Sequence, residues 1–173
     1  MKHELHKDEI MSPQILEEAF NRADFDRELA FKFFVMFSMF EHALKETGFR
    51  QVNPNGDVHP DWDAFARAIN GQFNPNTSPE LNTAVNYFIN HPVKKQVFRN
   101  NHLTFAQSPR PQNISDTEWL SLLIRRVRNN LFHGGKVNYD RPRDTLLIQF
   151  AIVILESWAI YDQNVEIAIH QIH

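Results

Sequence analysis

The run from Ser115 to Gly135 constrains the fold of this chain most strongly, because its apolar residues recur at helical spacing. They lie three or four positions apart and form one stripe of a helix: Leu120, Leu123, Ile124, Val127 and Leu131. Ser115 and Glu118 are spaced for a capping box at its start, and Gly134 suits the left-handed residue that ends a helix. We therefore expect an amphipathic helix over residues 115–133 that packs on a core through one face.

Helical spacing and capping residues recur along most of the chain. They predict further helices at residues 12–23, 25–47, 62–71, 78–91, 93–99 and 142–169. Residues 49–60 and 100–114 are predicted to be loops. No segment shows the alternation of apolar and polar residues that is typical of a sheet. We expect an all-α fold, an up-and-down helical bundle with additional short helices. A single domain is expected over residues 1–173, with residues 1–11 as a flexible N-terminal segment.

The predicted helix at residues 25–47 is apolar on two sides. One stripe is Phe33, Phe37, Phe40 and Leu44, and the stripe on the far side is Phe31, Val35 and Met39. A helix with two apolar faces is either central in its bundle or shared with another subunit.

Composition limits the classes of protein to which the chain can belong. The absence of Cys excludes disulfides, a thiol nucleophile and Cys-based zinc sites. Residues 1–11 lack the apolar stretch of a secretory signal, and the longest apolar run, Leu146 to Leu155, is about half of what a membrane span needs. We expect a soluble, cytoplasmic protein.

Any binding of nucleic acid must depend on a local patch, because the net charge is −3. One candidate patch runs from residue 125 to residue 143, where only two carboxylates, Asp140 and Asp144 just past Arg143, offset a run of cations: Arg125, Arg126, Arg128, Lys136, Arg141 and Arg143. Arg125, Asn129 and His133 recur every four residues on the outer face of the predicted helix. The helix dipole favours a cationic imidazole at its end, so this group suits a phosphodiester. The alternative is an ordinary solvated surface.

Arg128-Asn129, followed by three residues and His133, resembles the signature of the HEPN domain family, an all-helical group rich in ribonucleases. The stretch Phe40–Lys45 is similar to the N-terminal helix of several members. The resemblance implies a metal-independent endoribonuclease with a composite active site at a homodimer interface. Its products would end in a 2′,3′-cyclic phosphate.

The resemblance also implies roles for particular residues. Arg128, Asn129 and His133 would be catalytic: Arg128 holds the phosphate, and Asn129 orients the phosphate or His133. The flanking cations Arg125, Arg126 and Lys136 are candidates for binding RNA. Glu41 is a candidate for orienting the guanidinium of Arg125 or Arg128 through an ion pair.

Neither a cofactor nor a metal ion is expected, because the chain has no metal-ligand spacing and no phosphate-binding glycine loop. The expected partners are RNA and a second copy of the chain, and the resemblance allows a protein antitoxin or regulator in a toxin or phage-defence setting. Two other functions stay open. One is a catalytically inactive HEPN-fold module that binds nucleotide or RNA or dimerises, and the other is a helical adaptor with a Phe-rich docking face.

Overall fold

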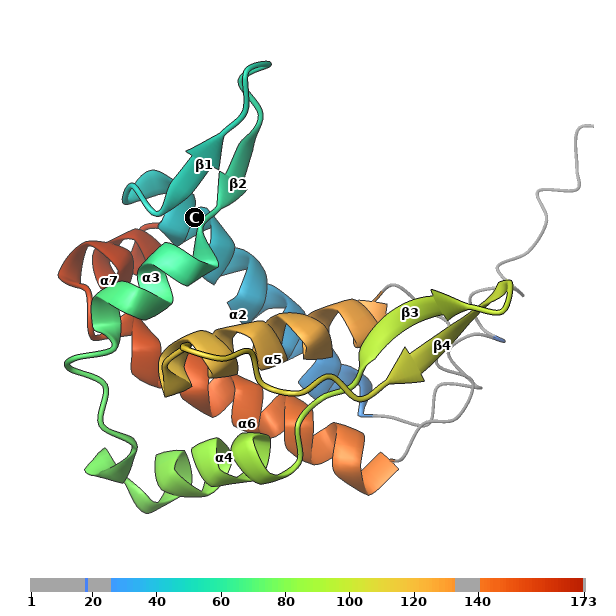
Figure 1. The fold of residues 1–173 in the computed structure, drawn as a ribbon. Helices are drawn as coiled ribbons and strands as arrows, with labels where there is room; N and C mark the ends of the chain where they lie inside the picture. The colour runs from blue at the N-terminus through green and yellow to red at the C-terminus, as the bar shows by residue number, and fades with distance from the viewer. Residues whose placement is uncertain (1–17, 19–25, 133–140, 173) are drawn as a thin grey trace, which may run out of the picture.

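The computed structural model of the chain describes residue 18, residues 26–132 and residues 141–172 (Figure 1). The helices are α2 (Arg27–Glu46), α3 (Trp62–Ile69), α4 (Pro79–Asn90), α5 (Asp116–Phe132), α6 (Arg141–Ala159) and α7 (Gln163–His170), with a 3₁₀ turn, η1, at Pro75–Thr77. The strands are β1 (Arg50–Val52), β2 (Val58–Pro60), β3 (Lys95–Arg99) and β4 (His102–Ala106). The predicted all-α class is therefore wrong, because two small antiparallel sheets accompany the helices.

The helices predicted at residues 25–47, 62–71 and 78–91 are confirmed as α2, α3 and α4. Each begins where a side-chain oxygen accepts a hydrogen bond from a backbone N–H of the first turn. The acceptors are Asp26 for α2, Asp61 for α3 and Ser78 for α4. The helix predicted at residues 12–23 lies outside the described residues except for Glu18, which is helical and exposed.

The two faces of α2 have different environments. The stripe of Phe33, Phe37, Phe40 and Leu44 is buried, as predicted, and packs in the core. On the other face Phe31 is 66% exposed and Val35 is 36% exposed, whereas Met39 packs partly against the core. The early part of α2 thus presents apolar surface to solvent.

The C-terminal helix predicted at residues 142–169 is broken into two helices. α6 ends at Ala159, and Asp162 accepts hydrogen bonds from the N–H groups of Asn164 and Val165 to begin α7. The two helices are bent by 115°. No single helix among the described residues is long and apolar enough to cross a membrane, although α6 and α7 together meet that length and composition.

α6 forms the centre of the core, with α4 and α2 packed against it (Figure 1). Its buried residues include Ile148, Ile154 and Trp158, and further apolar side chains around it are half-buried. Its apolar residues therefore surround the helix instead of forming one stripe.

Each sheet is a hairpin in a region where the sequence predicts no strand. β1 and β2 replace the loop predicted at residues 49–60, and the Asn53 side chain accepts the N–H groups of Asn55 and Asp57 in the turn between them. β3 and β4 replace the helical turn predicted at 93–99 and part of the loop at 100–114. Asn100 and Asn101 both have positive φ, at 50° and 59°, which closes a tight two-residue hairpin turn.

Candidate functional site

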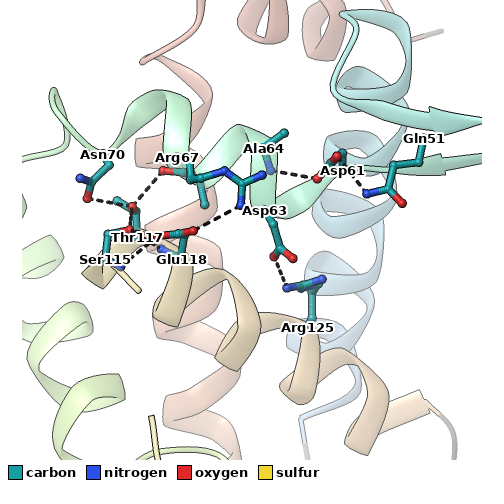
Figure 2. Close-up of polar contacts among 11 residues, drawn as sticks. Gln51, Asp61, Asp63, Ala64, Arg67, Asn70, Ser115, Thr117, Glu118 and Arg125 are labelled. Carbon is teal, nitrogen blue, oxygen red and sulfur yellow. Dashed lines mark hydrogen bonds and ion pairs between the residues drawn. The ribbon is translucent and has the colours of Figure 1, made fainter. Parts of the chain in front are cut away.

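Helix α5, which carries the Arg128–Asn129 pair, is fixed at its start by the predicted capping box. The Ser115 N–H donates to Glu118 Oε2 at 2.9 Å, and the Glu118 N–H donates to Ser115 Oγ at 3.2 Å. Hydrogen bonds from the backbone and the hydroxyl of Ser115 lower the pKa of Glu118. Thr117 Oγ1 donates to the Ala66 carbonyl at 2.9 Å, which joins this turn to α3 (Figure 2). The start of α5 is therefore well anchored.

Ion pairs between α3 and α5 run along one side of the helix (Figure 2). Arg67 lies 3.4 Å from Glu118 in the first turn, and Arg125 Nη2 lies 2.6 Å from Asp63 Oδ1 about two turns later. Glu41 was predicted to orient the guanidinium of Arg125 or Arg128 through an ion pair. Arg125 is held by Asp63, and Glu41 instead accepts a hydrogen bond at 3.2 Å from the Trp62 indole N–H.

Arg128 and Asn129 lie together in the last turns of α5. Arg128 Nη1 donates to Asn129 Oδ1 at 3.3 Å, and the guanidinium carbon is 5.8 Å from the ring centre of Phe37 on α2. Arg128 is half-buried, whereas Asn129 is exposed. This contact with Phe37 orients the guanidinium through a cation–π interaction and places it beside α2.

Arg126 and Asn130 face a third direction, towards the chain that enters β3. Arg126 Nη1 donates to the Val93 carbonyl at 3.0 Å, and Asn130 Nδ2 donates to the Lys94 carbonyl at 2.9 Å. The Arg126 guanidinium also lies 5.3 Å from the ring centre of Trp119. Burial lowers the pKa of Arg126, and the charge of Arg125 lowers it further. These contacts make Arg126 a residue that positions the hairpin.

The three neighbouring arginines therefore point to different elements. Successive helical residues are about 100° apart, so Arg125 reaches α3, Arg126 reaches the base of β3, and Arg128 reaches α2. Asn129 is the exposed residue among them. His133 and Lys136, also predicted at this site, lie outside the described residues.

Sequence reasoning missed three residues that organise this region, Asp63, Asn130 and Val93. Each acts through a contact with a distant segment, and no spacing within the chain indicates such a contact. Among the described residues, no group of three or more His, Asp or Glu side chains lies together in a way that could hold a metal ion.

We compared the chain with models of protein families, with curated proteins and with solved structures. None of them matches.

The described part of the site offers two complementary groups. A guanidinium presents a planar fork of N–H donors to two phosphate oxygens, and it stays charged at any physiological pH. The neighbouring amide of Asn129 can donate to a third oxygen or accept from a hydroxyl. A ribose phosphodiester has atoms that can engage both groups, because anionic phosphate oxygens lie next to a 2′-hydroxyl.

Proposed function

We propose that the chain is a metal-independent endoribonuclease of HEPN type that acts in the cytoplasm as a homodimer, with a composite active site at the dimer interface. The observation that carries the proposal is the pairing of Arg128 with Asn129 at the solvent-accessible end of α5. His133 follows the last described residue of this helix, Phe132, in the sequence. A guanidinium, an amide and an imidazole are thus supplied by one short segment.

The exposed apolar face of α2 supports the dimer. Phe31 and Val35 lie on the same helix as Phe37, which contacts Arg128. Exposed apolar surface of this kind is stabilised by burial against another surface. A second copy that packs there by a two-fold axis would cover Phe31 and Val35.

The dimer also meets a chemical requirement. Cleavage forms a bond between the 2′-oxygen and phosphorus and breaks the bond from phosphorus to the 5′-oxygen. One imidazole takes the 2′-hydroxyl proton, and an imidazolium from the other copy gives a proton to the leaving 5′-oxygen. Arg128 stabilises the negative charge that develops on the phosphoryl oxygens. The products are a 2′,3′-cyclic phosphate and a 5′-hydroxyl.

The test is incubation of the purified protein with end-labelled RNA in EDTA, followed by analysis of the product ends. We expect cleavage that leaves 2′,3′-cyclic phosphates. His133→Ala should lower the rate by about 10²–10⁴-fold, as expected for loss of a general acid or base. The matched control is His59→Ala, which removes an exposed imidazole from β2 and should leave the rate unchanged.

Three results would refute the mechanism: products that end in a 3′-hydroxyl, activity that disappears with EDTA, or a His133→Ala variant that cleaves within a few-fold of wild type. Binding of RNA without cleavage by the wild-type protein would instead favour the inactive RNA-binding module.

A further inference from the structure

The β3–β4 hairpin is an exposed ribbon with an unusual composition. No Asp or Glu occurs between Glu80 and Asp116, although the chain as a whole contains 21 acidic residues. The hairpin and its entry carry three exposed cations, Lys94, Lys95 and Arg99. Its largest exposed apolar side chains are Phe98, which is 67% exposed, and Leu103, which is 61% exposed. Basic and aromatic residues without acidic neighbours are typical of surfaces that bind single-stranded nucleic acid.

The strand register separates the side chains of the ribbon into two faces. Phe98 is opposite Leu103, and Gln96 is opposite Phe105, so one face is largely apolar. On the other face Arg99 is opposite His102, and Lys95 is on the same side as Arg99. The ribbon is only two strands wide, with about 4.8 Å between strands. Long Lys and Arg side chains can therefore reach around its edge.

The base of the hairpin is clamped to the helices that carry the candidate site. Side chains of α5 and α6 donate to three backbone carbonyls of the entering chain: Arg143 to His91, Arg126 to Val93 and Asn130 to Lys94. The first of these bonds is the longest, at 3.4 Å, and the other two are 3.0 and 2.9 Å. Figure 1 shows β3 beginning beside the end of α5 and the hairpin projecting away from the helical body. The ribbon is thus tied to the turns that hold Arg128 and Asn129.

We propose that the β3–β4 hairpin is an RNA-binding arm that recognises an unpaired strand. Phe98 stacks on a base, while Lys95 and Arg99 bind the phosphates of the same strand. The inference rests on the proposed function for the reaction, and it adds the substrate class, single-stranded RNA that is led from the arm to the end of α5.

A single strand fits the arm better than a duplex. Bases in a duplex are stacked on one another, so their faces are not available to Phe98. An unpaired base can lie flat on an exposed aromatic ring, whichever base it is. We therefore expect the arm to prefer unpaired RNA of any sequence.

The test measures binding separately from cleavage. The probe is a fluorescent 2′-O-methyl RNA oligonucleotide of about 12 nucleotides, within the range of single-strand-binding modules. It cannot be cleaved, because its 2′-hydroxyls are blocked. Fluorescence anisotropy with the full chain should show that Phe98→Ala weakens binding by at least about five-fold, the lower range for loss of one stacked base. The duplex form of the probe should bind more weakly than the single strand.

The charges are tested by salt dependence. The double variant Lys95→Ala/Arg99→Ala should lower the slope of log K against log salt by about 0.7 per charge removed, as for single strands in general. Matched controls are Val52→Ala, on the exposed β1–β2 hairpin, and Arg67→Ala, beside the opposite end of α5. Neither control should change the affinity.

The outcomes distinguish this inference from the proposed function. If Phe98→Ala and the double variant bind the probe as wild type does, the hairpin is not an RNA-binding arm. The ribonuclease proposal still stands in that case, provided that RNA is cleaved. If binding of the probe depends on the hairpin but no RNA is cleaved, the RNA-binding role of the hairpin is supported and the ribonuclease proposal fails. If Phe98→Ala leaves binding unchanged and alters only self-association in sedimentation, the apolar face is a protein contact, and the inference is wrong.

Discussion

The guanidinium of Arg128 is oriented by the ring of Phe37 and by the side-chain amide of Asn129. Arg128→Lys keeps the charge but loses the planar fork. If Arg128 stabilises the transition state, this variant should bind the non-cleavable oligonucleotide within a few-fold of wild type. Its single-turnover cleavage should fall by about 10²–10³-fold, as for loss of one oriented donor. Equal losses in binding and cleavage would show that Arg128 only holds the substrate.

Glu41 accepts a hydrogen bond from the Trp62 indole N–H, a contact that the spacing in the sequence did not predict. Trp62 is 2% exposed, and its ring stacks with those of Phe37 and Phe40. Glu41→Gln keeps an acceptor oxygen and should have the stability of wild type. Glu41→Ala leaves the indole N–H without this acceptor. It should lower the free energy of unfolding, measured in urea, by about 1–3 kcal/mol.

Cleavage rates give the second readout for Glu41. Both variants should cleave RNA at the wild-type rate under conditions in which they are folded. A Glu41→Gln protein with normal stability but slow cleavage would show that Glu41 takes part in catalysis.

At the scale of secondary structure, the capping box of α5 makes stability depend on pH. Hydrogen bonds from Ser115 hold the pKa of Glu118 below its ordinary value in the folded protein. The stabilisation from Glu118 is therefore complete above the unfolded pKa and is lost as the pH falls through the folded pKa. We expect the urea midpoint to decrease between about pH 6 and about pH 3, and Glu118→Gln to reduce this decrease.

Asp61, the N-cap of α3, contributes a separate part of the same pH dependence. A hydrogen bond from Gln51 and one from the backbone of Ala64 lower its pKa. Glu118→Gln should therefore reduce the pH dependence of the urea midpoint without removing it. An unchanged profile in that variant would mean that the capping box does not persist in solution.

The helices were predictable because their signals are local. Three predicted helices begin at side-chain caps, Asp26, Asp61 and Ser78, and the apolar stripe of α5 is buried. The break at Asp162 was missed because apolar spacing continues from α6 into α7, so only the cap marks the new helix.

The hairpins were missed because their strands are only three to five residues long and largely exposed, so the alternation of Leu103 and Phe105 in β4 is too short to distinguish a strand from a loop. The pair Asn100-Asn101 was the one local signal of β3–β4, since Asn accepts positive φ more readily than other non-glycine residues. Within the site, sequence spacing placed Arg128 and Asn129 together in one helix. Sequence spacing could not predict the ion pair of Arg125 with Asp63 or the hydrogen bond from Arg126 to the Val93 carbonyl, because those contacts depend on how α3 and the start of β3 pack against α5.

At the scale of the whole molecule, the proposed active site requires two copies. Phe31 is 66% exposed on α2, so Phe31→Asp should prevent association by placing a charge in the interface. Sedimentation should then give a monomer with wild-type helical circular dichroism, and cleavage should be lost together with the dimer.

The matched control for the dimer is Ile160→Asp, because Ile160 is 64% exposed but lies between α6 and α7. That variant should remain dimeric and active. A wild-type protein that is monomeric at micromolar concentration and still cleaves RNA would rule out the composite site.

The clamp on the entry to β3 has a consequence for how this protein can change over evolution. Its three bonds end on carbonyl oxygens, which every residue possesses, so the clamp does not depend on the side chains at His91, Val93 or Lys94. Substitutions or insertions towards the hairpin tip leave those acceptors in place. The hairpin can therefore diversify, or be exchanged for another ribbon, while α5 and its Arg128–Asn129 pair stay the same.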